Sequence, residues 1–146
     1  VNRVEHSQSG AVMAFRLLDK MRFPAEEICT IVSAIGNHDE GTGIPVNEVA
    51  AALIIADKSD VGRSRVRNPE DVSVDIHDRV NYSATHSELA VDPEGKTLTL
   101  EIQVDTAISS PMEYLEIFMK RMLLCRSAAE KLNLRFSLRI NGQTLI

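Results

Sequence analysis

Residues 36–67 read GNHDEGTGIPVNEVAAALIIADKSDVGRSRVR, and the rest of the chain is organised around them. The stretch begins with a glycine-rich loop that runs from His38 to Pro45. Residues 49–56 are then an unbroken apolar run, and a helix that is apolar nearly all round is typical of the centre of a fold. We therefore expect a central helix between a polar loop and a basic segment.

Two further helices are expected before this loop. Residues 4–21 carry an apolar stripe at helical spacing, formed by Val12, Met13, Phe15, Leu17 and Leu18. Pro24 suits the first turn of a second helix, and Gly36 is a suitable place for that helix to end. Residues 1–68 are therefore predicted to form an entirely helical region.

The pattern changes from helical to alternating in the second half. Residues 97–104 alternate apolar and polar side chains, which predicts a half-buried strand. The turn sequence at 92–95 predicts a hairpin with an earlier strand near residues 82–91. Residues 68–71 have the composition of a turn or short linker, and residues 72–81 fit no single pattern.

A long helix and a last strand are expected to complete this half. Ser110 can cap a helix that begins at Pro111, and Glu113 completes a capping box for residues 111–132. A final strand places its apolar side chains on one face, namely Leu134, Phe136, Leu138 and Ile140. Asn141-Gly142 then predicts a tight turn. The predicted fold class is α+β, with a β-β-α-β region at 69–146 whose mainly antiparallel sheet is covered by one long helix.

Composition limits the classes of function. Hydrophobic residues make up 44% of the 146 residues, enough for a core, and the net charge of −5 argues against general nucleic-acid binding. Cys29 and Cys125 lie in apolar helical patterns, so we expect buried free thiols. The longest apolar run, residues 49–56, is too short for a membrane span, and no secretory signal opens the sequence. A cytoplasmic location without membrane binding is the expectation.

Three residues are candidate ligands for a divalent metal ion. His6, His38 and Asp57 lie at the ends of the three predicted helices, and imidazole and carboxylate groups suit such a cation. In the alternative interpretation the histidines lie on the surface and in a loop, and Asp57 pairs with Lys58 or an arginine. His77-Asp78 repeats the His38-Asp39 dipeptide, and we interpret that copy as a surface turn or helix with charge pairs.

A basic cluster follows the candidate metal ligands. It consists of Lys58, Arg63, Arg65 and Arg67. In an extended segment the three arginines would point the same way, and guanidinium groups match the geometry of phosphate. A solvated surface that balances the acidic remainder of the chain is the alternative.

The sequence from residue 3 to about residue 67 resembles the HD superfamily of metal-dependent phosphohydrolases. The similar segments are His6 with SQSGA, IGNHDEGTGIP at 35–45, and AALIIADKSD at 51–60. They are most similar to the downstream half of an HD domain of the HD-GYP kind. Residues 76–146 resemble a tail found in some uncharacterised HD-domain proteins.

Two interpretations of this resemblance are open. In the one we favour, the family's defining His and His-Asp dyad precede Val1, so the chain is a fragment or a divergent form with an incomplete metal site. In the other, His6 is the first histidine, His38-Asp39 is the dyad, and Asp57 is the last ligand. That second interpretation places the dyad and Asp57 closer together than the family pattern has them.

The resemblance implies a metal-dependent phosphohydrolase that acts on a nucleotide or another phosphate ester through metal-activated water. It implies a divalent ion, with Mg, Mn, Fe or Zn all open, and a phosphate-containing small molecule as partner. Asp39 and Lys58 are the candidate catalytic residues. A catalytically inactive regulatory or nucleotide-binding module is the first alternative, and a structural dimerisation domain is the second. We also expect a homo-oligomer, for which the methionines of helix 111–132 offer packing.

Overall fold

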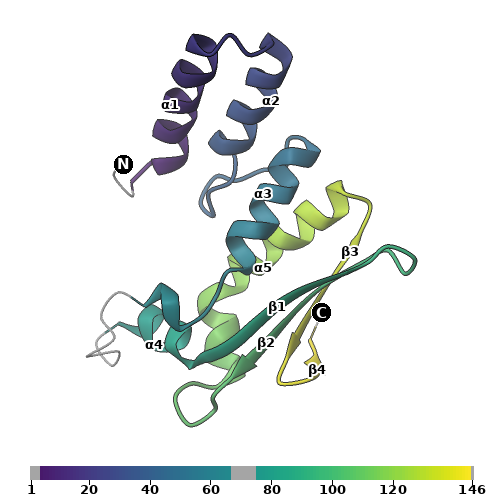
Figure 1. Ribbon diagram of the computed structural model, residues 1–146. Helices are drawn as coiled ribbons and strands as arrows, with labels where there is room; N and C mark the ends of the chain where they lie inside the picture. The colour runs from purple at the N-terminus through teal and green to yellow at the C-terminus, as the bar shows by residue number, and fades with distance from the viewer. Residues whose placement is uncertain (1–3, 67–74, 146) are drawn as a thin grey trace.

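The computed structural model describes residues 4–66 and 75–145 and confirms the predicted α+β class (Figure 1). Three helices come first: α1 (His6–Lys20), α2 (Ala25–Gly36) and α3 (Glu48–Ser59). A 3-10 turn, η1 (Arg63–Arg65), and a short helix, α4 (Ile76–Ser83), follow. The remaining elements are β1 (Ala84–Asp92), β2 (Thr97–Val104), α5 (Pro111–Lys131), β3 (Arg135–Ile140) and β4 (Gln143–Thr144).

Helices α1 and α2 form a hairpin that packs through small residues. A Cβ atom at Gly36 would lie 3.6 Å from the Cβ of Ala11, and one at Gly10 would lie 3.3 Å from Ile35. The larger apolar side chains of α1 point away from α2, so Val12, Met13, Phe15 and Leu17 are half or more exposed. Of the apolar stripe predicted in residues 4–21, Leu18 is therefore half-buried, and the other four side chains are exposed among the described residues.

The sheet has four strands in the order β1-β2-β3-β4. The β1–β2 and β3–β4 pairs are antiparallel, whereas β2 and β3, on either side of α5, run parallel. The predicted inward face of β2 is confirmed, because Leu98, Leu100, Ile102 and Val104 are all buried. Helix α5 lies across one face of the sheet (Figure 1), as predicted, and its capping box at Ser110 and Glu113 is present.

Helix α4 occupies part of the segment that had no clear pattern. Asp75 is its N-cap residue, and the Asp75 carboxylate accepts a hydrogen bond from the backbone N–H of His77. Val80 and Ser83 turn inward and are fully buried. The turn predicted at 68–71 lies outside the described residues.

One core joins the helical region to the sheet. Helix α3 packs on both α2 and α5, and it contributes Ala51, Ile54 and Ile55 to the cluster that also holds the inward residues of the sheet and α5. The packing therefore crosses the predicted boundary at residues 68/69. Cys125 is buried as predicted, but the prediction for Cys29 is wrong, because Cys29 lies on the exposed side of α2. No helix in the described ranges is long and apolar enough to span a membrane.

Candidate functional site

The structure brings two of the three predicted metal ligands together. His6 is the first residue of α1, and His38 follows the C-terminus of α2 by two residues. The Nε2 atoms of the two rings are 3.1 Å apart, and the rings meet edge to face with centroids 5.0 Å apart. A hydrogen bond of 2.8 Å from Gln8 Nε2 to the carbonyl oxygen of Gly36 holds the same two helix ends together.

The orientation of His38 is fixed by its own helix. Its Nδ1 lies 2.6 Å from the carbonyl oxygen of Ile35, and a carbonyl can only accept, so Nδ1 carries the proton. In a neutral ring, Nε2 then carries the lone pair, and it faces His6. Metal-binding histidines are commonly held in this way. Two imidazole nitrogens on one tetrahedral metal lie about 3.3 Å apart for bonds of about 2.0 Å, close to the distance observed here.

Asp57 has a different partner. Its Oδ2 accepts a hydrogen bond of 2.5 Å from Nζ of Lys58, whose side chain is 7% exposed while that of Asp57 is 38% exposed. Burial acts to raise the pKa of Asp57, but the hydrogen bond and charge of Lys58, with the charges of His38 and Arg65, bring that pKa below its ordinary value. Asp57 therefore lies in the electrostatic field of His38 while it pairs with Lys58.

The histidine pair and Asp57 do not form a closed ligand set. Within residues 4–66 and 75–145, no group of three or more His, Cys, Asp or Glu side chains is placed to hold one metal ion. The two histidines thus converge as the metal interpretation requires. Asp57 adopts the ion pair with Lys58 that the alternative interpretation requires.

Asp39, a candidate catalytic residue, shapes the glycine-rich loop through its backbone. Its carbonyl oxygen accepts hydrogen bonds from the N–H groups of Thr42 and Gly43, at 3.3 and 2.6 Å. A Cβ atom at Gly43 would lie 2.4 Å from that oxygen, so only glycine fits there. The loop then docks on α5, where Arg121 Nε lies 3.4 Å from a carboxylate oxygen of Glu40.

The predicted phosphate-binding arginines diverge. Arg63 and Arg65 lie in a 3-10 turn rather than an extended segment, so these two side chains do not share one direction. Arg63 donates a hydrogen bond of 2.9 Å to the carbonyl oxygen of Tyr82 and lies over the Tyr82 ring at 4.6 Å. Arg65 forms an ion pair with Asp60. Arg67 lies outside the described residues.

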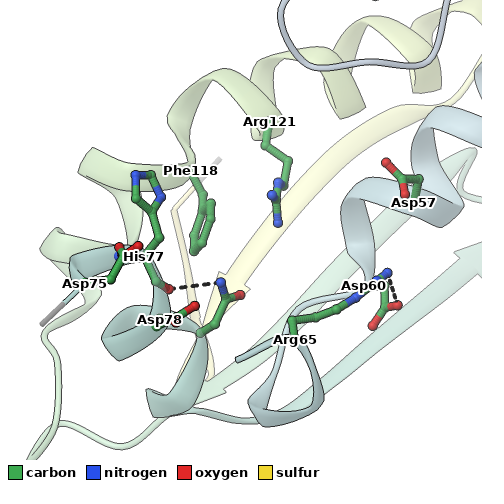
Figure 2. A pocket seen from close by; sticks show the side chains of 9 residues that line it. Asp57, Asp60, Arg65, Asp75, His77, Asp78, Phe118 and Arg121 are labelled. Atoms are coloured by element: carbon green, nitrogen blue, oxygen red, sulfur yellow. Dashed lines mark hydrogen bonds and ion pairs between the residues drawn. The ribbon is translucent and has the colours of Figure 1, made fainter. Parts of the chain in front are cut away.

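A pocket of about 400 Å³ lies between α3, η1, α4 and α5 (Figure 2). Arg65 and Asp57 line it, as expected of a cleft at the end of α3, but the two histidines of the pair are not among its lining residues. Arg121 also lines the pocket, with its guanidinium group 4.5 Å from the centre of the Phe118 ring. The remaining lining residues are Asp60, Asp75, His77, Asp78 and Asn81.

Most of the residues that line this pocket were not predicted from the sequence. The interpretation of His77-Asp78 as a surface segment is correct for His77, which is exposed, but wrong for Asp78, which is only 9% exposed. The segment is too short and too polar to show a helical period, so nothing marked which side faced inward. Arg121 follows Phe118 by three residues on the predicted helix, a spacing that does place two side chains together.

Comparison with family models, with curated proteins and with solved structures found no significant match. The class of protein is therefore argued from the site itself, and the resemblance to the HD superfamily stays a prediction.

Proposed function

We propose that this protein is a metal-dependent phosphohydrolase that acts on a nucleotide or another phosphate ester. The observation that supports the proposal is the His6–His38 pair, with Nε2 atoms 3.1 Å apart and the His38 ring oriented by Ile35. Two residues 32 positions apart converge with the spacing and the tautomer that a shared metal needs. Imidazole ligands favour Zn or Fe over Mg or Mn.

The neighbouring residues are suited to the rest of this chemistry. A metal bound by His6 and His38 would supply activated water for attack on phosphorus. Lys58 is a buried ammonium group beside Asp57, able to hold a phosphate oxygen. Arg65, at the edge of the adjacent pocket, is a second candidate for a phosphate contact.

Asp57 and Lys58 make the binding of metal and phosphate interdependent. If Asp57 turned to a metal ion, the ammonium group of Lys58, with a side chain only 7% exposed, would lose its carboxylate partner. Removing one partner of a buried ion pair is costly, whereas a phosphate oxygen would replace the lost carboxylate. We therefore expect phosphate to tighten metal binding, and metal to tighten phosphate binding by the same factor.

The test is calorimetric titration with Zn²⁺ and Mn²⁺, with and without inorganic phosphate. His38→Ala removes one ligand and is expected to weaken metal binding by about tenfold or more. His86→Ala is the matched control, because His86 is an exposed histidine on β1 far along the chain. Metal-dependent phosphate release from a panel of nucleotides and phosphate esters then tests catalysis. Equal metal affinity in both variants contradicts the proposed metal site.

The Asp57–Lys58 ion pair also favours a second candidate, a catalytically inactive module that binds a metal or a nucleotide. Within the described part of the chain, only two side chains of the predicted ligand set meet, and a catalytic metal commonly has three protein ligands. Metal binding that depends on His38, without phosphate release from any substrate of the panel, supports this second function.

The dimerisation alternative and the cytoplasmic location stay predictions. Met122 belongs to the buried core, whereas Met112 and Met119 are exposed on α5. Light scattering of the purified protein measures the oligomeric state directly. A monomer contradicts both the expected homo-oligomer and a purely structural dimerisation role.

A further inference from the structure

The α4 side of the pocket holds a buried carboxylate without a counter-charge. Asp78 is 9% exposed and lines the pocket, where Figure 2 shows it beneath the open space. Its carboxylate forms no hydrogen bond or ion pair with any residue that the structure describes, and its oxygens are open to the pocket and not fully enclosed. On the next turn of α4, Asn81 donates through Nδ2 to the carbonyl oxygen of His77, but its buried Oδ1 has no partner in the described chain. Both unpaired groups, the Asp78 carboxylate and Asn81 Oδ1, are hydrogen-bond acceptors.

The other charges around the pocket are already neutralised. Three ion pairs account for them: Asp57 with Lys58, Asp60 with Arg65, and Arg121 with Glu40. The remaining carboxylate, that of Asp75, caps α4 from an exposed position. The uncompensated negative charge therefore lies on α4, at Asp75 and Asp78.

A buried, unpaired carboxylate is unfavourable unless something supplies positive charge. The N-terminus of α4 supplies part of it, but a helix dipole offsets only a small part of the cost. Within the described residues, no third acidic or histidine side chain joins Asp75 and Asp78 in a group that could hold a metal ion. An ammonium group does fit, because it donates to a single carboxylate and needs no closed set of ligands.

We propose that this pocket binds a small organic cation, with a primary ammonium group at Asp78 and the apolar part of the molecule beside Phe118. The volume of about 400 Å³ lies within the range of small-molecule sites. Phe118 is the apolar residue among those that line the pocket; it is 2% exposed, and the Arg121 guanidinium lies over its ring. Asp75 can receive a second ammonium group, which favours a short diamine over a monoamine.

The test is calorimetric titration of the full chain with 1,4-diaminobutane, with neutral 1,4-butanediol as the matched control ligand. The diamine is expected to bind and the diol is not. Asp78→Asn keeps the shape of the side chain and removes its charge, and it is expected to weaken diamine binding by roughly 30-fold or more. Asp19→Asn makes the same change of charge on the exposed side of α1 and is expected to leave binding unchanged.

Asp75→Asn provides a second test in case Asp78→Asn does not fold, because asparagine caps a helix as well as aspartate does. It is expected to weaken diamine binding while the circular dichroism spectrum stays that of the wild type. No binding of the diamine, or equal affinity in Asp78→Asn and Asp19→Asn, overturns the proposal. His38→Ala is expected to bind the diamine normally, so this proposal and the metal proposal fail separately.

Discussion

The position of α5 over the sheet can be tested with one substitution made on two neighbouring strands. Leu100 on β2 and Leu89 on β1 are directly opposite in the antiparallel register, so their side chains lie on the same face of the sheet. Leu100 is 0% exposed, whereas Leu89 is 37% exposed. Helix α5 covers the centre of the sheet, while β1 is the edge strand.

The expected losses in the free energy of unfolding differ because only the substitution at Leu100 leaves a closed cavity. Leu100→Ala removes a fully enclosed side chain, so both the transfer term and the cavity term apply, and we expect a loss of about 3–5 kcal/mol. At Leu89 solvent can fill the space, and part of the side chain is exposed already. The loss there is expected to be about 1–2 kcal/mol.

Urea unfolding followed by far-UV circular dichroism measures both values, since the chain has no tryptophan for fluorescence. With an m-value of about 2 kcal/mol/M, the two midpoints should differ by roughly 1 M. Equal losses at Leu89 and Leu100 would refute the inferred coverage of the sheet. A larger loss at Leu89 would mean that the protein buries β1 instead.

Three further substitutions or treatments test local features. Ser110→Ala removes the side-chain cap of α5 and is expected to lower the free energy of unfolding by about 1 kcal/mol, measured by urea denaturation; an unchanged midpoint contradicts the capping box. A thiol reagent is expected to modify the exposed Cys29 in the native protein and Cys125 only after unfolding, because Cys125 is buried and burial raises its pKa to about 12; rapid modification of both contradicts the packing. Asp57 has a lowered pKa in the folded state, so its stabilising contribution is present above the unfolded-state pKa and is lost as pH falls through the folded-state value. As the pH falls from roughly 5 to 2, the free energy of unfolding of Asp57→Asn should therefore decrease less than that of the wild type. An equal decrease in both proteins would contradict this.

Features encoded by neighbouring residues were predictable from the sequence. The capping box needs only Ser110 and Glu113, three positions apart, and the inward face of β2 needs only alternation. The parallel pairing of β2 with β3 depends on where α5 returns the chain, which the alternation in either strand does not encode. Helix α4 was missed because a segment of eight residues, most of them polar, gives too few turns for a period to emerge.

Burial was predictable only where a covering element exists. The stripe on α1 has helical spacing, but α1 meets α2 through Gly10 and Ala11, so Phe15 and Leu17 lie on the opposite side. Cys29 is exposed for the same reason on α2. Periodicity shows that a helix is amphipathic, and it does not show whether a partner covers the apolar face.

The candidate site shows the same difference between residues with a partner nearby in the sequence and residues with a distant partner. Asp57 has Lys58 as its immediate neighbour, so its charge is satisfied without any ligand, and the sequence already contained that alternative. His6 and His38 are 32 positions apart and meet only because α1 and α2 form a hairpin. Their meeting therefore follows from how the two helices are arranged, and the spacing of the two residues in the sequence does not encode it. Asp78 has neither kind of partner within the described residues. A largely buried carboxylate with only the N-terminus of a short helix as its positive neighbour in the described chain is a group whose environment a cationic ligand would complete.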